Sequence, residues 1–475
     1  MKTYLFYDIE TSGLNPVFDQ ILTFASIRTD ENFNEVERNS FIIKLRPDIV
    51  PSPQAFLVHR LTFDDLSAGI SEYEAVKQIH TMVNQPGTVS LGYNTLKFDD
   101  EFLRFSFYRN LFDPYTHQYK NGCSRMDIFP FTILFYIFKP QVIVWPQNNE
   151  KISLKLEAIS AKNSLVTSGR AHEAMADVEA TLNLARIFAK EKEIFTYIID
   201  FFNKQKDEQR INKFKKSIKI KGFSYKLGII LSHRLGFDAN YMALAINIGK
   251  SIKYSNQNLW LRLDKESLLR FADKPEDLSC LIERKRFGDL PVILPAIDRF
   301  VKKLNRENLQ IAENNIKEIL NNTQDFFEIT KFYKEFEYPY IPDLDPDAEL
   351  YQTGFFSITE KQDISSFHRG DSESRIQLID QMKTKRIKTL AQRIINRNHS
   401  LFDKESLESM KSSEFAQLLH RLRVSDSDKV VKGYKEDRKF NCADALKELC
   451  SVNELDLDSE QKKIIDWLKD YIQKY

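Results

Sequence analysis

The hydrophobic and polar positions of the first 190 residues follow two periods in turn. Strand-like runs, rich in β-branched and aromatic residues, are predicted over 4–10, 20–30, 39–46 and 88–94. Helical periods are predicted over 71–83, 99–112, 153–162 and 173–192. Three strands in succession, followed by helices that alternate with strands, predict an α/β fold with a mixed sheet packed between helices.

The pattern changes after residue 192, where short hydrophobic pieces with strand-like spacing predict a small β-rich domain. Residues 335–350 then contain three prolines within eight residues, which indicates an extended linker. Few glycines and a helical period in the rest of the chain predict an all-helical C-terminal domain. We therefore predict three domains, over residues 1–192, 193–340 and 350–475.

The composition is that of a globular protein with ample material for hydrophobic cores. The chain has 475 residues, of which 42% are hydrophobic, and this length fits about three domains. Its net charge is only +1, so any nucleic-acid binding must come from local patches. Two segments are locally basic, 203–226 and 383–397. Each could line a nucleic-acid channel or present a solvated face.

The cysteines and the apolar segments of the sequence indicate the cellular compartment of the protein. The four cysteines form no C-x-x-C pair, which predicts reduced, mostly buried thiols. The N-terminus enters a strand directly and lacks the pattern of a signal peptide. The most apolar run, residues 129–138, is too short to span a bilayer. We expect a soluble cytoplasmic protein without membrane attachment.

Two carboxylates end the first predicted strand, in the sequence YLFYDIETSGLNP (4–16). Side chains alternate along a strand, so Asp8 and Glu10 leave the same face a few ångströms apart. Like charges held this close repel unless they share protons or a cation lies between them. Alone, the pair is better explained as solvated carboxylates at a strand end, and more carboxylates are needed before a cation site is favoured.

Further candidates follow later in the chain. Asp99 begins a predicted helix, and Asp177 lies five residues after His172. Five helical residues turn well past a full circle, so His172 and Asp177 converge only if His172 lies on a loop before the helix. Taken singly, these residues have ordinary explanations: an acid at a helix N-terminus, a surface histidine and a charge on a helix face.

The order D-x-E, then an acid after an aromatic residue, then H-x(4)-D, on this β/α pattern, is typical of one family. The chain resembles the DEDDh exonucleases, 3′→5′ exonucleases of RNase H-like fold, and within them bacterial exonuclease I. The three motifs are DIETSGLNP (8–16), GYNTLKFDDEF (92–102) and AHEAMAD (171–177). Stretches typical of exonuclease I are FYRNLFDPY (107–115), SRMDIF (124–129) and LYQTGFFS (350–357), so the resemblance covers nearly the whole chain.

The resemblance implies a DNA-repair hydrolase that degrades single-stranded DNA processively from its 3′ end and releases 5′-mononucleotides. It assigns metal binding to four acids and the general base to His172. Two Mg²⁺ ions about 4 Å apart, for which Mn²⁺ is a possible substitute, suit all-carboxylate ligands and phosphodiester chemistry. A histidine suits proton transfer near neutral pH. The four implied metal ligands are Asp8, Glu10, Asp99 and Asp177.

The resemblance also implies contacts with DNA and with another protein. Its second domain would be SH3-like, and with the helical domain would close a basic channel over the nuclease domain. The C-terminal tail of single-stranded DNA-binding protein is an implied partner, and a monomer is expected. The family often has tryptophan at the position of Tyr119, and tyrosine can still stack on a base. It often has arginine at the position of Lys155, and lysine keeps the charge but cannot form a bidentate contact with phosphate. The implied strand contacts are Thr11, Arg104, Tyr115, Tyr119 and Lys155.

Two other functions stay open at this point. One is an RNase or a proofreading exonuclease of the same superfamily, although these are typically built around the catalytic domain alone. The other is a non-catalytic single-strand-binding protein that kept the fold. The presence of all five catalytic positions disfavours it. Metal-dependent nucleotide release, compared on DNA and RNA, separates the three functions.

Overall fold

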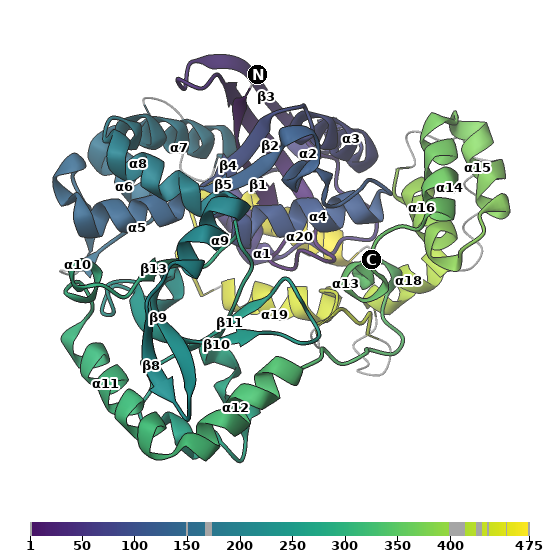
Figure 1. The fold of residues 1–475 in the computed structure, drawn as a ribbon. Helices are drawn as coiled ribbons and strands as arrows, with labels where there is room; N and C mark the ends of the chain where they lie inside the picture. Colours follow the sequence, from purple (N-terminus) through teal and green to yellow (C-terminus); the bar gives the residue numbers. More distant parts are fainter. Residues whose placement is uncertain are drawn as a thin grey trace. The chain divides into compact units, whose positions relative to one another are not determined.

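A computed structural model describes residues 2–148, 151–166, 173–398, 414–423, 430–434, 437–452 and 454–473. The chain divides into two compact units, each described here by itself. Unit 1 comprises residues 1–125, 166–182 and 340–475. Unit 2 comprises residues 126–165 and 183–339. Figure 1 shows the helices and strands with the labels used below.

The principal sheet has the strand order β3-β2-β1-β4-β5, with the central strand β1 antiparallel to β2 and parallel to β4. Its strands are β1 (Thr3–Thr11), β2 (Ile21–Thr29), β3 (Glu35–Ile42), β4 (Thr88–Gly92) and β5 (Ser124–Asp127). The predicted mixed α/β sheet is confirmed, although β3 begins four residues early. The hydrophobic pattern did not indicate the first four residues of β3, because β3 is an edge strand and most of its exposed positions carry polar side chains.

Helices of unit 1 cover the sheet. The helices are α1 (Pro53–His59), α2 (Phe63–Ala68), α3 (Glu72–Val83), α4 (Asp99–Arg109) and the start of α7 (Ala174–Ala189). α3 and α4 pack on β1 and β2, where Val76 and Phe102 meet Leu5 and Phe24 in one core. Both helices were predicted, whereas α1 and α2 are too short for their period to be recognised.

The C-terminal part of unit 1 is mainly helical over its described residues, as predicted, with one isolated antiparallel bridge between Lys432 and Arg438. Its helices are α13 (Leu350–Thr353), α14 (Ile358–Arg369), α15 (Ser372–Gln381), α16 (Lys385–Arg397), α18 (Glu414–Arg423), α19 (Cys442–Val452) and α20 (Ser459–Gln473). α14, α15 and α16 lie side by side (Figure 1). α15 and α16 are separate helices, because Met382 and Thr384 adopt extended backbone conformations between them.

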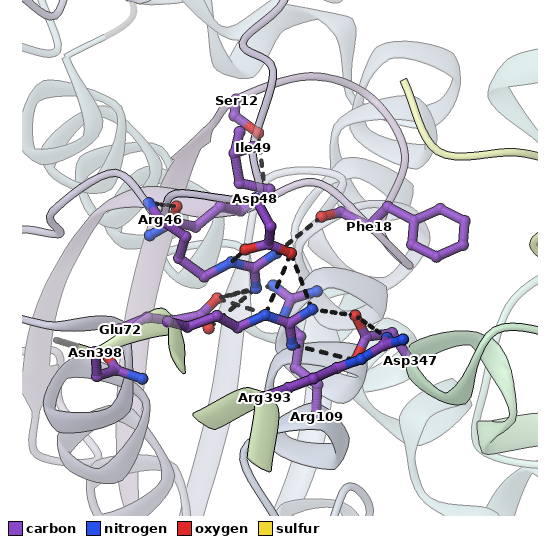
Figure 2. A network of polar contacts seen from close by, with 12 residues as sticks. Ser12, Phe18, Arg46, Asp48, Ile49, Glu72, Arg109, Asp347, Arg393 and Asn398 are labelled. Carbon is purple, nitrogen blue, oxygen red and sulfur yellow. Dashed lines mark hydrogen bonds and ion pairs between the residues drawn. The ribbon is translucent and has the colours of Figure 1, made fainter. Parts of the chain in front are cut away.

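Buried ion pairs join this helical part to the first 125 residues. Arg397 of α16 donates to Asp48 at 2.9 Å, and Arg46 donates to the same carboxylate at 3.1 Å. Burial alone would raise the pKa of Asp48, but Arg397 and then Arg46 hold it well below its usual range. Figure 2 shows the side chains that meet here, among them Arg46, Asp48, Glu72, Arg109, Asp347 and Arg393.

These ion pairs change the interpretation of the basic segment 383–397. Arg393 and Arg397 are 2% and 6% exposed and bind Asp345, Asp347 and Asp48. A strand channel and a solvated face are therefore both wrong for these two arginines. A charge count in the sequence cannot detect this, because the balancing acids lie up to 349 residues away.

Unit 2 is built on a second, antiparallel sheet of order β12-β11-β10-β9-β13, with β8 paired to β9. Its strands are β8 (Lys216–Ile220), β9 (Phe223–Leu231), β10 (Met242–Lys250), β11 (Asn258–Arg262), β12 (Ile282–Lys285) and β13 (Val292–Pro295). Two short strands, β6 (Gln147–Asn148) and β7 (Lys151–Ile152), pair separately. The predicted β-rich region is present, and Trp260 lies fully buried in its core.

Helices accompany this second sheet. They are α5 (Phe129–Phe138), α6 (Leu156–Asn163), α8 (Lys192–Ile199), α9 (Lys204–Asn212), α10 (Asp298–Val301), α11 (Arg306–Asn321) and α12 (Thr323–Glu335). α11 and α12 contact β10 and can be followed below the sheet in Figure 1. Neither was predicted from the sequence. Among the residues that the structure places, no helix is long and apolar enough to cross a membrane.

Candidate metal-dependent active site

Three carboxylates from two elements converge at the end of the central strand. Asp8 and Glu10 lie on β1, and Asp177 lies in the first turn of α7. One oxygen atom from each carboxylate lies within 4.8 Å of the other two. Asp177 reaches this place because Val178 and Leu182, which are 1% and 2% exposed, bury the adjoining face of α7. The predicted convergence of these three acids is thus present in the structure.

The loop after β1 is fixed by its own hydrogen bonds. Asp19 accepts the backbone N–H of Asn15 at 2.8 Å and the hydroxyl of Ser12 at 3.3 Å. Thr11, a predicted strand contact, is 6% exposed and donates its hydroxyl to the carbonyl of Gly13 at 2.7 Å. The D-x-E pair is therefore presented by a strand and an ordered turn.

Asp99, the fourth predicted acid, opens α4 and is 5% exposed. Its charge acts on the other acids. The pKa of Asp8 lies well above its usual range. Burial is the largest cause, and the charges of Asp99, Glu10 and Asp177 raise the pKa further. Burial also raises the pKa of Glu10 to about 8, with Asp177 and Asp99 adding to it. Asp99 is buried and the other three acids are half-buried, so the four carboxylates repel one another when ionised, which is the situation that a cation relieves.

The donor set fits a divalent metal ion. All four candidate ligands are carboxylates, and hard cations such as Mg²⁺ prefer oxygen. Three of them converge from a strand and a helix, whereas Asp99, at the start of α4, is not a member of that 4.8 Å group but acts on the pKa of Asp8 through its charge. His172, the predicted general base, lies outside the described residues. The described part of α7 begins at Ala174, two residues after it.

The remaining predicted strand contacts lie in different surroundings. Tyr119 is 65% exposed, whereas Tyr115 is half-buried, with its ring 5.3 Å from that of Phe355. Lys155 is exposed and belongs to unit 2, whereas the other four belong to unit 1. Arg104 is 5% exposed, and its guanidinium already donates to Asp100, Glu101 and Tyr351. The DNA-binding roles of these residues stay predictions.

Sequence reasoning did not find the residues that surround the first turn of α4. Arg125 and His117 both contact Asp100, and Tyr351 comes from α13, almost 250 residues further along the chain. The block LYQTGFFS pointed to the region of Tyr351 but not to its contact. Only the tertiary fold brings these side chains to α4.

Comparison with known proteins agrees with this geometry. An exonuclease family model matches residues 5–185, which include all four acids and His172. Exodeoxyribonuclease I of Escherichia coli K12 is 30% identical over 376 residues, which cover 76% of this chain and 78% of that protein. The chain belongs to the exodeoxyribonuclease I family. The predicted family and the predicted class of enzyme, a nuclease, are therefore confirmed.

Solved structures of exonuclease I extend the likeness to the whole chain. The crystal structure of E. coli exonuclease I with a dA16 oligonucleotide superposes with a TM-score of 0.80 at 25% identity and covers 100% of both chains. A crystal structure of SSB/exonuclease I in complex with the inhibitor CFAM gives 0.79 at 25% identity, covering 100% of this chain and 99% of that one. The RNase H-like sheet and the helical C-terminal region are thus those of the exodeoxyribonuclease I fold.

Proposed function

We propose that this exodeoxyribonuclease I family member degrades single-stranded DNA from the 3′ end, releasing 5′-mononucleotides, with two Mg²⁺ ions as cofactors. The observation that carries the proposal is the convergence of the half-buried Asp8, Glu10 and Asp177, each with a carboxylate oxygen within 4.8 Å of the other two. Asp99 is proposed as the fourth ligand. After burial, its charge contributes most to raising the pKa of Asp8, as expected for a neighbouring carboxylate. When bound, the ions polarise the phosphate and supply an activated water.

The protein's own residues hold the strand end and move one proton. His172 precedes Asp177 by five residues and would accept the proton of the attacking water, for which a histidine is suited near neutral pH. The exposed ring of Tyr119 is available to stack on a base, an interaction worth about 1–3 kcal/mol. Thr11, Tyr115 and Lys155 are proposed as further contacts, and Arg104 is treated below.

A basic hairpin in unit 2 supports binding of a single strand. β8 and β9 form this hairpin, which carries exposed lysines and an exposed aromatic ring, Phe223 (64% exposed). These lysines make no ion pair with any described residue, so their charges are available to phosphates. A chain of net charge +1 thus still offers a concentrated local charge. Lys216, Lys219 and Lys221 lie on the hairpin itself, and Lys213 and Lys215 immediately precede it.

The rest of the proposal concerns organisation and partners. Functional domains at 1–192, 193–340 and 350–475 are proposed, the second SH3-like, with the β8–β13 sheet in its support. The C-terminal tail of single-stranded DNA-binding protein is proposed as a partner, and the crystal structure of SSB/exonuclease I supports an SSB contact. A monomer acting in cytoplasmic DNA repair is proposed.

The four cysteines are free thiols in the structure. Only Cys123 and Cys442 are buried, whereas the sequence predicted that most of the four would be.

One digestion experiment tests the proposed activity. A 5′-labelled single strand, its duplex, an RNA of the same sequence and a 3′-blocked strand are each incubated with the protein and Mg²⁺. We expect stepwise shortening of the unblocked single DNA strand only, with 5′-mononucleotides as products and no reaction in EDTA. Equal cleavage of RNA would favour an RNase of the superfamily, and binding without metal-dependent release would favour a non-catalytic binder.

A further inference from the structure

A cluster of charged side chains surrounds the first turn of α4, next to Asp99. Asp100 is fully buried and accepts hydrogen bonds from Arg104 Nη2 and Arg125 Nη1, both at 2.5 Å. It also accepts the Nε2–H of His117 at 3.1 Å. Burial would raise the pKa of Asp100, but Arg125 and then Arg104 hold it well below its usual range. Asp100 is therefore a fixed anion beside the proposed metal ligand.

Tyr351 ties the C-terminal helical part of unit 1 to this turn. Its hydroxyl accepts a hydrogen bond from Arg104 Nη1 at 2.7 Å and donates one to Glu101 Oε2 at 2.5 Å. Arg104 Nη1 also donates to Glu101 Oε1 at 2.5 Å. The Tyr351 ring lies 5.4 Å from the ring of Phe105, edge to face. One phenol thus contacts two charged residues of the α4 helix.

The start of α4 has no side-chain cap of its own. Its N-cap residue is Phe98, whose side chain cannot accept a hydrogen bond, so only its backbone carbonyl does, from the N–H of Glu101 at 3.1 Å and of Phe102 at 3.2 Å. A helix that begins without such a cap frays easily unless other contacts hold its first turn. At α4 these contacts are the hydrogen bonds that Asp100 and Glu101, the second and third residues of the helix, make with Arg104, Arg125 and Tyr351.

We infer that Tyr351 and Arg104 are positioning residues that hold the first turn of α4, so that Asp99 faces the other three acids. The inference rests on the proposed metal site. Arg104 acts here through Asp100 and Glu101 and not by meeting phosphate. The helical region that follows residue 340 therefore contributes to metal binding as well as to the fold. Groups that orient metal ligands typically change metal affinity by 10–100-fold when removed.

Metal titration of Tyr351→Phe tests the inference. The substitution removes only the hydroxyl and leaves the ring on Phe105. We expect Mn²⁺ binding, measured by calorimetry and by the electron paramagnetic resonance of free Mn²⁺, to weaken about tenfold in one of two sites. The Mg²⁺ concentration for half-maximal digestion should rise by a similar factor, and excess Mg²⁺ should restore the rate. Tyr340→Phe, at a 76% exposed tyrosine, is the matched control and should match the wild type.

Two further variants separate the possible outcomes. Asp99→Ala should lose one Mn²⁺ site, and if it keeps both, the proposed metal site is wrong. If Asp99→Ala loses the site while Tyr351→Phe binds Mn²⁺ as the wild type does, the positioning inference is overturned. Glu101→Gln removes the charge that accepts from Arg104 and Tyr351, and should weaken the same site. An unchanged Mn²⁺ affinity in Glu101→Gln would also overturn the inference, whatever the rate of digestion.

Discussion

The candidate metal site consists of acids from β1, α4 and α7, and of the side chains around α4 that hold one of these acids in place. Asp8 and Glu10 are two apart on a strand, so local geometry alone places them on one face. Asp99 and Asp177 come from separate helices, so only the order of the three motifs along the sequence indicated that they join the first two acids. Tyr351 and Arg125 belong to no motif that carries chemistry, and they reach α4 only through tertiary contacts.

Loss of a metal-binding acid should abolish cleavage and spare strand binding. Asp8→Ala and Asp177→Ala each remove one member of the carboxylate group while leaving the basic hairpin β8–β9 intact. We expect the digestion rate to fall more than tenfold, while affinity for a labelled strand in Ca²⁺ stays within about threefold. Asp64→Ala, at an exposed acid of α2, is the control. A variant that kept more than about a tenth of the wild-type rate would contradict the assignment.

His172→Ala should lower turnover by roughly 10²–10⁴-fold, the usual cost of losing a general base. Hydroxide becomes more available as pH rises, so the variant should recover part of its rate above about pH 9. The measurement is the pH dependence of initial digestion rate for the wild type, His172→Ala and the control His420→Ala, at an exposed histidine of α18. An unchanged pH profile would show that another group takes the proton.

At the scale of elements, period and composition identified long helices and buried strands but misjudged charge. The basic segments 203–226 and 383–397 look alike in sequence. In the structure the first forms α9 and then a hairpin with exposed lysines, whereas the second is a helix in which Arg393 and Arg397 are buried against acids. A helix with a hydrophobic face packs that face against the core. Whether the helix's basic side chains are also buried depends on the presence of acids elsewhere in the chain that can pair with them.

The basic hairpin should therefore account for part of the salt dependence of strand binding. Lys219→Glu with Lys221→Glu reverses two of its charges without touching the carboxylates. The log–log slope of affinity against salt should become shallower by about 0.7 for each phosphate contact removed. Fluorescence anisotropy of a labelled oligonucleotide in Ca²⁺, over a salt series, measures the slope. The control reverses Lys462 and Lys463, exposed on α20. Equal slopes in the two double variants would exclude the hairpin from the strand's path.

At the scale of the molecule, sequence divided the chain into consecutive segments, whereas unit 1 is discontinuous. Residues 1–125 share buried ion pairs with residues 340–475. Sequence reasoning cannot find such a division, because hydrophobic periodicity reports on neighbours along the chain and not on partners hundreds of residues away.

A fragment that ends near residue 192 should therefore fail to fold, because it leaves Asp48 buried without Arg397 and Lys439. The full-length variant Arg397→Met should be destabilised by about 3–5 kcal/mol, the cost of breaking a buried pair. Urea unfolding followed by circular dichroism measures this, with the exposed Lys383→Met as the control. A cooperative unfolding transition in the 1–192 fragment would show that the pairs are dispensable.

The pairing of Asp48 with Arg397 also sets an order of events during synthesis. The two residues are separated by 349 positions, so at 5–20 residues per second the ribosome supplies the arginine roughly 20–70 s after the aspartate. Until then the acid has Arg46 beside it but lacks the cations that the helical part supplies. Tyr351, which holds the first turn of α4, also arrives late. A nascent chain thus carries its four acids long before it can hold them in place, and cleavage should begin only once translation is nearly complete.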